Sequence, residues 1–270
     1  MRITFIGGGN MASALIGGLL AGRLSPGDIR VVDPVESQRA LLVQRFGVGV
    51  SADAAGAVAG SDVTVLSVKP QQMREAASAL AAHVRGQLVI SVAAGIRASD
   101  LSRWLGGHAR IVRAMPNTPA LIGQGVTGLA PFPGLADADR ARADEILRAV
   151  GQTVWVDEEG LLDAVTAVSG SGPAYVFHFI EAMLAGARAL GLNEAQARAL
   201  TIGTFTGAAR LAAESDEPPS VLRERVTSKG GTTAAALAVM SERGIATHIA
   251  DAMAAACRRS VELGDEFGQG

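Results

Sequence analysis

Ile3-Thr-Phe-Ile-Gly7-Gly-Gly9-Asn-Met-Ala12, at the start of the 270-residue chain, is the stretch that decides the fold. Its first four residues predict a buried strand, its glycines a tight turn, and the residues from Met11 onward a helix. In a dinucleotide-binding fold, Gly7 makes the turn, Gly9 lets the backbone approach the pyrophosphate, and Ala12 lets the helix pack closely on the strand. The alternative is a tight strand-to-helix turn in another α/β protein.

An acidic residue ends the second predicted strand. Asp33 follows the glycine loop by about 20 residues, where a ribose-binding acid is expected. Its carboxylate would favour NADH, because a 2′-phosphate at about 4 Å would be repelled by about 4 kcal/mol per charge pair at an effective dielectric of about 20. Arg30 and Arg39 are close in sequence and could reorganise this pocket. The predicted cofactor is therefore NADPH or NADH.

Short apolar runs alternate with helical segments in the first part of the chain, which predicts a doubly wound, Rossmann-like α/β sheet. The predicted strands are 3–6, 29–32, 63–68, 88–92, 111–114, 126–129 and 153–156. After about residue 161 only helices are predicted, namely 173–190, a helix from the Asn193–Gln196 capping box to 214, 221–225, 233–242 and 245–263. We therefore expect a dinucleotide-binding domain at 1–162 and an all-helical domain at 163–270.

Composition excludes several classes of protein. The 24 basic and 26 acidic residues nearly cancel and form no basic cluster, so a nucleic-acid partner is not expected. Cys257 is the only cysteine and the four histidines show no ligand spacing, so no metal site is predicted. The charge-free stretch 114–136 holds four prolines and cannot form a membrane helix. A cytoplasmic protein without a membrane partner is expected.

A second glycine-rich segment lies late in the chain, VTSKGGTTAAAL at 226–237. Gly230 and Gly231 free the backbone, and Thr232 and Thr233 stand where a helix would begin, so unpaired N–H groups could bind a carboxylate or phosphate. The alternative is a glycine turn with Thr232 as a simple N-cap. Because the N-terminal loop suits a cofactor, this segment is predicted to hold the substrate.

Six segments, taken in order, resemble the pyrroline-5-carboxylate reductase family over essentially the whole chain. They are FIGGGNMASAL, SVKPQQM, SVAAGI, RAMPNTPALIGQG, DAVTAVSGSGPAYVFHFIEAM and VTSKGGTTAAAL. The resemblance implies NAD(P)H-dependent reduction of 1-pyrroline-5-carboxylate to L-proline, the last step of proline biosynthesis. It also implies a homodimer interlocked through the helical C-terminal domains, and a further ring of dimers, a decamer.

The same resemblance implies which residues form the two sites. The pyrophosphate would be lined by Gly7, Gly9, Asn10 and Met11, and the cofactor bounded by Val68, Lys69 and Pro70, with Ala93 and Ala94 close to the nicotinamide half. The backbone amides of Gly231, Thr232 and Thr233 would receive the substrate carboxylate, and the Thr233 hydroxyl would bond the ring nitrogen as the catalytic group. Glu159 matches an acidic position near the substrate. Two residues depart from the family: Lys229 stands where many relatives have proline, and Asp33 where NADPH-preferring members often have a small polar residue.

Three other functions compete with this interpretation. β-Hydroxyacid dehydrogenases resemble the chain at a G-S-G-x-x-x-K segment, but Val176 stands at the lysine position and cannot accept a proton. An imine reductase for bulkier rings is a second enzymatic alternative. A dinucleotide-binding regulator without activity is the third, although the glycine and threonine segments of both sites are intact.

Overall fold

The structure, a computed structural model, describes residues 1–269. Contacts divide the chain into two compact units. The first unit comprises Met1–Ser171 together with the C-terminal segment that begins at Ala255, and the second is Gly172–Ala254. The division expected at residues 162 and 163 stays a prediction. No helix within residues 1–269 is both long and apolar enough to cross a membrane.

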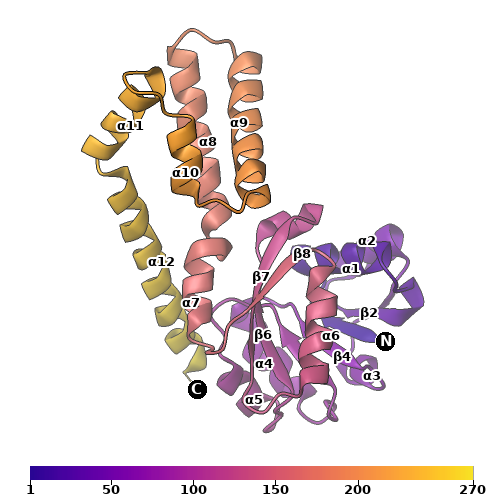
Figure 1. Cartoon of the computed structure of the whole chain (residues 1–270). Helices are drawn as coiled ribbons and strands as arrows, with labels where there is room; N and C mark the ends of the chain where they lie inside the picture. The colour runs from indigo at the N-terminus through magenta and orange to yellow at the C-terminus, as the bar shows by residue number, and fades with distance from the viewer. Residues whose placement is uncertain (270) are drawn as a thin grey trace. The chain divides into compact units, whose positions relative to one another are not determined.

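An eight-stranded sheet forms the first unit (Figure 1). Its strands are β1 (Ile3–Ile6), β2 (Ile29–Val32), β3 (Gly49–Ser51), β4 (Val63–Leu66), β5 (Leu88–Ser91), β6 (Ile111–Met115), β7 (Gly125–Pro131) and β8 (Gly151–Trp155). They lie in the order β3-β2-β1-β4-β5-β6-β7-β8, and every neighbouring pair is parallel except β6 and β7. The predicted Rossmann-like α/β sheet is confirmed.

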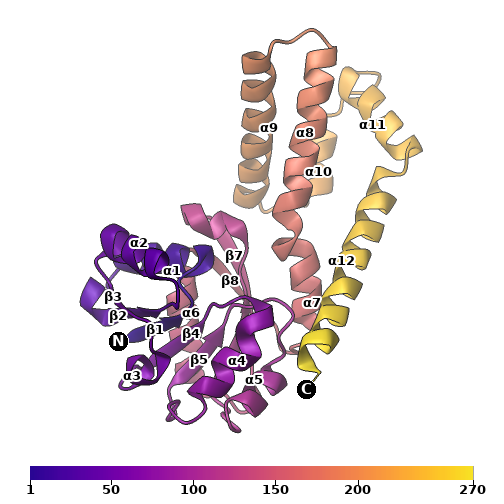
Figure 2. The same ribbon diagram turned by 180° about the vertical axis from the view of Figure 1, so that it is seen from behind.

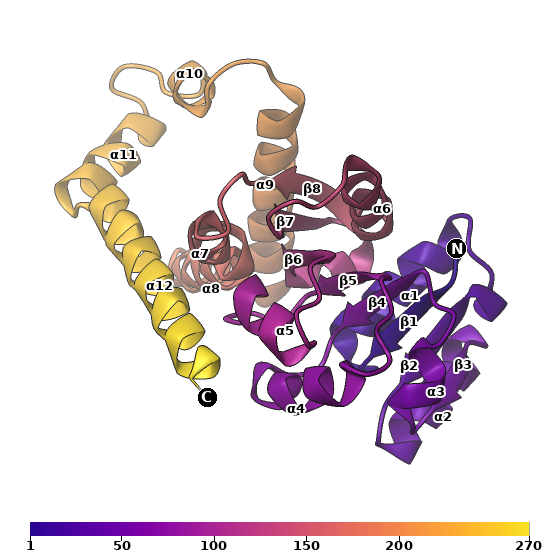
Figure 3. The same ribbon diagram turned by 90° about the horizontal axis from the view of Figure 1, so that it is seen from below.

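Helices cover both faces of this sheet because its strands are apolar on both sides. One face packs on α1 (Asn10–Ala21), α2 (Glu36–Phe46) and α6 (Asp137–Arg148), and the other on α3 (Ala54–Val58), α4 (Pro70–Leu80) and α5 (Ala98–Trp104). Figure 1 shows α6 in front of the strands, Figure 2 shows α4 and α5 from behind, and Figure 3 shows the strands between α6 and α4.

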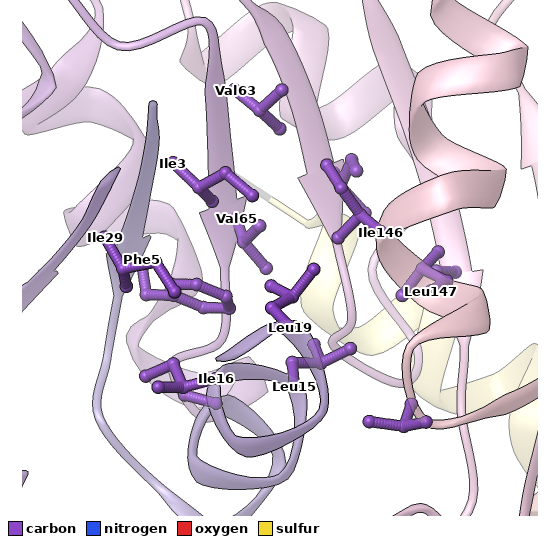
Figure 4. Packing of buried hydrophobic residues seen from close by; sticks show 14 of the residues in the cluster. Ile3, Phe5, Leu15, Ile16, Leu19, Ile29, Val63, Val65, Ile146 and Leu147 are labelled. Atoms are coloured by element: carbon purple, nitrogen blue, oxygen red, sulfur yellow. The ribbon is translucent and has the colours of Figure 1, made fainter. Parts of the chain in front are cut away.

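Successive strand residues point to opposite faces, so β1 contributes to two separate cores. Ile3 and Phe5 belong to the core under α1 and α6, whereas Ile6 belongs to the core under α4 and α5. Figure 4 shows the first core, in which Phe5 lies among Leu15 and Ile16 of α1 and its strand neighbours. This packing fixes the start of α1, and with it the glycine loop, relative to the sheet.

The chain leaves the sheet through α7 (Leu161–Val165) and a π-helical turn, Thr166–Gly170, which end the main segment of the first unit. The second unit contains α8 (Gly172–Ala189), α9 (Glu194–Glu214), α10 (Pro219–Arg225), α11 (Thr232–Glu242) and the first turns of α12 (Ile245–Gly268). The capping box at the start of α9 is confirmed, since Asn193 Oδ1 accepts from the Gln196 amide at 2.9 Å and Gln196 Oε1 accepts from the Asn193 amide at 3.0 Å. Figures 1 and 2 show α8 and α9 side by side.

Large apolar side chains of the second unit are exposed. They include Phe177 and Met183 on α8, Leu200 and Leu211 on α9, and Met240 on α11. Within the described chain, the only buried residues of this unit are Ala197 and Thr201 of α9. A unit of this kind buries its apolar faces only when another surface covers them.

Candidate active site

Four loops meet along the carboxyl edge of the sheet. The register pairs Ile6 with Val32 and with Leu66, and Leu66 with Ser91, so β2, β1, β4 and β5 end side by side. The residues that follow these strands therefore line one edge. The connections from β1 and from β4 run to opposite sides of the sheet, and such a switch point is where doubly wound folds bind dinucleotides.

Gly7, which follows β1, contacts residues at the ends of the two neighbouring strands, β2 and β4. Its φ is +96°, and a Cβ at this position would lie 2.8 Å from the Ser67 carbonyl oxygen and 2.9 Å from the Val68 nitrogen. The Ser67 hydroxyl donates to the Gly7 carbonyl at 2.8 Å, and the Gly7 amide donates to the Val32 carbonyl at 2.8 Å. Only glycine fits both this conformation and this contact, so the tight turn predicted at Gly7 is present.

The side of the loop that faces outward is open. Gly9 and Asn10 are exposed, Met11 is half-buried, and a Cβ built on Gly9 would meet no other atom of residues 1–269 within 4 Å. Gly9 is the N-cap of α1, no side chain of the described residues caps the helix, and its first turn carries no acidic residue. The free amides and partial positive charge of this helix start fit a pyrophosphate.

Asp33 holds the glycine loop in place. Its Oδ2 accepts from the Gly8 amide at 2.8 Å and its Oδ1 accepts from the Val35 amide at 2.9 Å. Arg39 donates from Nη1 to the carbonyls of Asp33 at 2.7 Å and of Pro34 at 2.9 Å. The carboxylate is buried, 9% exposed. It lies at the predicted position, but two backbone N–H groups already occupy its oxygens.

The remaining residues expected at the cofactor lie on the same edge. Val68 is half-buried beside Gly7, Lys69 is the exposed N-cap of α4, and Pro70 begins that helix. After β5, Ala93 is buried in the core under α4 and α5, whereas Ala94 is half-buried. The structure thus brings all the predicted cofactor-binding residues together along one edge, with Ala93 available only through its backbone.

Glu159 is engaged inside the first unit. Its Oε1 accepts from the Ala98 amide at the start of α5 at 2.6 Å and from Nη1 of Arg113 at 3.1 Å. Arg113 is 3% exposed, so Glu159 neutralises a buried guanidinium, which would be costly to leave unpaired. The contacts give Glu159 a structural role, and its expected contact with substrate stays a prediction.

The second glycine segment forms the start of α11 in the second unit. Gly230 has a φ of +73°, the Gly231 amide donates to the Ser228 carbonyl at 3.0 Å, and Gly231 is the N-cap of α11. Among the described residues no side chain caps this helix, and no acidic residue lies in its first turn. Thr232 is exposed and Thr233 half-buried. Thr232 is therefore not a side-chain N-cap, and the amides of Thr232 and Thr233 stay free for an anion, whereas that of Gly231 is bonded to Ser228.

Several residues that position these sites were not predicted from the sequence. Gly8 packs on Leu42, because a Cβ there would lie 2.6 Å from its Cδ1, and Gln38 donates from Nε2 to the Gly8 carbonyl at 2.5 Å. Ser67 bonds Gly7, and Arg113 bonds Glu159. A polar residue at the end of a buried strand, as at Ser67, was the one sequence signal available for this set.

Two stretches of the chain match family models of known proteins. Residues 159–263 match the family model described as pyrroline-5-carboxylate reductase dimerisation, and residues 2–95 match the model described as NADP oxidoreductase coenzyme F420-dependent. The Pseudomonas aeruginosa protein named pyrroline-5-carboxylate reductase is 46% identical over 269 residues, which cover 99% of this chain and 98% of that protein.

Two solved structures are similar along almost their full length. The pyrroline-5-carboxylate reductase of Coxiella burnetii is 39% identical, with a TM-score of 0.92 over 97% of this chain and 98% of the other. The Plasmodium falciparum pyrroline carboxylate reductase, solved with NADP bound, is 26% identical, with a TM-score of 0.87 over 98% of each chain.

Proposed function

The chain belongs to the pyrroline-5-carboxylate reductase family and reduces 1-pyrroline-5-carboxylate to L-proline with NADPH or NADH, and we propose that the start of α11 holds the substrate. The observation that carries this proposal is the uncapped α11 N-terminus beside two threonines. The substrate carboxylate accepts hydrogen bonds from the free backbone amides of Thr232 and Thr233, and from that of Gly231 when it turns away from the Ser228 carbonyl. Such bonds to a charged group are worth about 1.5 to 3 kcal/mol each.

The cofactor occupies the carboxyl edge of the first unit. The open side of Gly9 and the free amides of Asn10 and Met11 receive its pyrophosphate, and Val68, Lys69 and Pro70 border it. Ala94 and the Ala93 backbone lie beside its nicotinamide half. The bound nicotinamide supplies the hydride, while these residues set its orientation, and orientation can lower a barrier by several kcal/mol.

Thr233 acts on the substrate ring nitrogen. An imine is basic, so its protonated and electrophilic form is available near neutral pH without a strong side-chain acid. The Thr233 hydroxyl hydrogen-bonds this nitrogen and orients it as the carbon accepts the hydride. Lys229, exposed just before the two glycines, adds a cation to the segment that binds the carboxylate.

The protein is a homo-oligomer, and we assign its contact to the second unit. The family model that matches residues 159–263 is one of dimerisation, and α8, α9 and α11 expose the apolar side chains that a partner copy would bury. Sedimentation at micromolar concentration should show no monomer. A further ring of dimers and a cytoplasmic location stay predictions.

One assay tests the reaction. Purified protein is mixed with 1-pyrroline-5-carboxylate and either NADPH or NADH, and the loss of the reduced-nicotinamide absorbance is followed together with L-proline formation. Turnover is expected with at least one cofactor. Absence of turnover with both would refute the proposal, and turnover with a β-hydroxyacid instead would favour the alternative class of dehydrogenase.

A further inference from the structure

The loop that follows β5, residues 92–97, is packed against the last turns of α12. A Cβ on Gly95 would lie 3.2 Å from the Leu263 Cβ and 3.2 Å from the Phe267 ring. Phe267 also packs on the core cluster that includes Ala93 and Ile96. This β5–α5 loop, which carries Ala93 and Ala94, therefore uses the C-terminal end of the chain as part of its support.

Arg97 adds an ion pair to the contact between this loop and α12. Its Nη2 lies 3.2 Å from Asp265 Oδ1, and its guanidinium lies on Gly264, where a Cβ would be 3.0 Å from Nη2. On the other side, its Nη1 lies 3.9 Å from Asp163 Oδ2. The Arg97 side chain is 28% exposed, and its partners differ: Asp163 is 6% exposed and Asp265 67%, so solvent screens the Asp265 pair more than the Asp163 pair.

A buried hydrogen bond fixes α12 in this position. Ser260 donates from Oγ to Asp163 Oδ1 at 2.6 Å, and both residues are 4% exposed. Figures 1 and 2 show the yellow end of α12 beside α7, the helix that carries Asp163. At the far end of α12, Arg103 of α5 donates from Nη2 to the Gly268 carbonyl at 2.9 Å. Ser260 and Gly264 are four residues apart and so face the same side of the helix.

The loop has few hydrogen bonds of its own. The Val92 amide donates to the Leu66 carbonyl at 3.0 Å, the Ala93 amide to Ser91 Oγ at 3.4 Å, and just beyond the loop Glu159 accepts from Ala98. Between these ends, α12 supplies the contacts at Gly95 and Arg97. Displacing the side chain of Arg97 should therefore shift the loop without opening the sheet.

We propose that Arg97, braced on Gly264 and Asp265, is a positioning residue that holds the β5–α5 loop against the nicotinamide half of the cofactor. The inference rests on the proposed placement of Ala93 and Ala94. The guanidinium is engaged on α12, so it acts through the loop backbone. Its effect therefore falls on the nicotinamide end, and the rest of the cofactor, which lies at the Gly7–Gly9 turn, is independent of it.

The test compares Arg97→Gln with Arg259→Gln in the full-length chain. Arg259 lies on α12, the helix that Arg97 contacts, and also forms ion pairs, with Glu262 at 2.9 Å and Glu266 at 2.7 Å, but it is 52% exposed. Binding is measured for NADPH and for 2′-phospho-ADP-ribose, which lacks the nicotinamide. Arg97→Gln should raise the Kd of NADPH roughly tenfold, about 1.4 kcal/mol, and leave the Kd of the fragment within about twofold.

Two further readouts exclude a purely structural effect. Arg97→Gln should increase the isotope effect on kcat when the transferred hydrogen is deuterium, and Arg97→Lys, which keeps the charge opposite Asp265, should restore part of the affinity. Arg259→Gln should change none of these values. Equal loss of affinity for NADPH and the fragment, or no loss for either, would overturn the inference.

A fourth variant separates this inference from the proposed function. Ala94→Phe places a ring where the nicotinamide is expected and should abolish NADPH binding while sparing the fragment. If Ala94→Phe abolishes NADPH binding and Arg97→Gln leaves the Kd of NADPH unchanged, the inference fails and the cofactor placement stands. If Ala94→Phe leaves the Kd of NADPH unchanged, the placement fails and the inference fails with it.

Discussion

Two glycine-rich turns of this chain each precede a helix, and they differ in what holds them. The turn at Gly7–Gly9 is tied to β2, β4 and Asp33, and a Cβ on Gly7 or Gly8 would overlap neighbouring atoms. In the second turn Gly230 is exposed and Gly231 half-buried, and its backbone bonds, from Gly231 to Ser228 and from Ala235 to Gly231, are local. Both precede a helix that no side chain of residues 1–269 caps.

The difference shows two ways of preparing an anion site. The first turn is preorganised by the sheet before any ligand arrives, which lowers the entropic cost of binding. The second has the donors but few contacts with other described residues, so less of its conformation is fixed before a ligand binds. Substitutions in the first turn should therefore be more damaging than the same substitutions in the second.

The largest expected effect is that of Gly7→Ala compared with Gly230→Ala. At Gly7 the positive φ and the contact with the Ser67–Val68 backbone act together, so the Kd of NADPH should rise at least roughly 100-fold, about 3 kcal/mol. At Gly230 only the positive φ opposes alanine, at about 1 to 2 kcal/mol, and the exposed loop can adjust, so the KM for 1-pyrroline-5-carboxylate should rise less than about 10-fold.

Circular dichroism and melting temperatures show whether each of these variants is folded. A folded Gly7→Ala protein that binds NADPH normally would contradict the preorganised turn. A Gly230→Ala protein as impaired as Gly7→Ala would show that the two turns are equally rigid.

Thr233→Ala should have the next largest effect. Removing one hydrogen bond to a charged group costs about 1.5 to 3 kcal/mol, which lowers kcat/KM by roughly 10- to 150-fold. Thr232→Ala is the matched control, because only its backbone amide is assigned to the substrate and the N-cap of α11 is Gly231. A loss below about twofold in Thr233→Ala would remove the hydroxyl from the mechanism.

Asp33→Asn tests what the carboxylate does in the first turn. Asparagine has one acceptor oxygen where the carboxylate serves both Gly8 and Val35. Affinity for both NADPH and NADH should therefore fall, by roughly fivefold, or about 1 kcal/mol for a lost hydrogen bond. Glu36→Gln, which removes a neighbouring charge at the start of α2, should leave the turn intact. A selective gain for NADPH in Asp33→Asn would instead show that charge repulsion of the 2′-phosphate dominates.

Helices and strands were predicted best where the local residue pattern and the packing of the element favour the same structure. β1 and β2 were predicted with their observed bounds, because each is a short, mostly apolar and mostly buried run that ends at a glycine or an acid. β3 and α3 were not predicted, since three and five residues are too few for a periodic pattern. The end of α12 was predicted at 263, five residues before its observed end at Gly268, because Gly264 suggests a stop unless its contact with Arg97 is known.

The same distinction holds for the candidate sites: positions along the chain could be predicted, whereas contacts between distant residues could not. The position of Asp33 could be predicted from its spacing after the glycine loop. Its partners could not, because they depend on how the backbone of Gly8 and Val35 turns in space. Glu159 was predicted near the substrate, whereas its bonds to Arg113 and Ala98 depend on contacts between residues far apart in the chain.

The smallest expected effect on the Gly7–Gly9 turn is that of a substitution at the opposite edge of its sheet, where Arg110 pairs with Asp139. Before β6, Arg110 forms two bonds to Asp139 of α6, Nε to Oδ2 at 2.8 Å and Nη2 to Oδ1 at 2.6 Å. The pair holds the pKa of Asp139 below its ordinary value, chiefly through the Arg110 hydrogen bonds and against the effect of burial. Because the folded pKa is the lower one, the pair stabilises the fold above the unfolded pKa of about 3.9.

Arg110→Ala should therefore lower the free energy of unfolding by about 1.5 kcal/mol at pH 7, a value near the low end because Arg110 is 45% exposed. The difference from the parent protein should shrink as the pH falls through the folded pKa of Asp139, as measured by urea denaturation. The Kd of NADPH at pH 7 should stay within about twofold, since the turn at Gly7–Gly9 is held by contacts at the other edge. A parallel loss of cofactor affinity would show that this turn depends on the stability of the whole unit, and the contrast between the two turns would then reflect their location in the fold more than their local contacts.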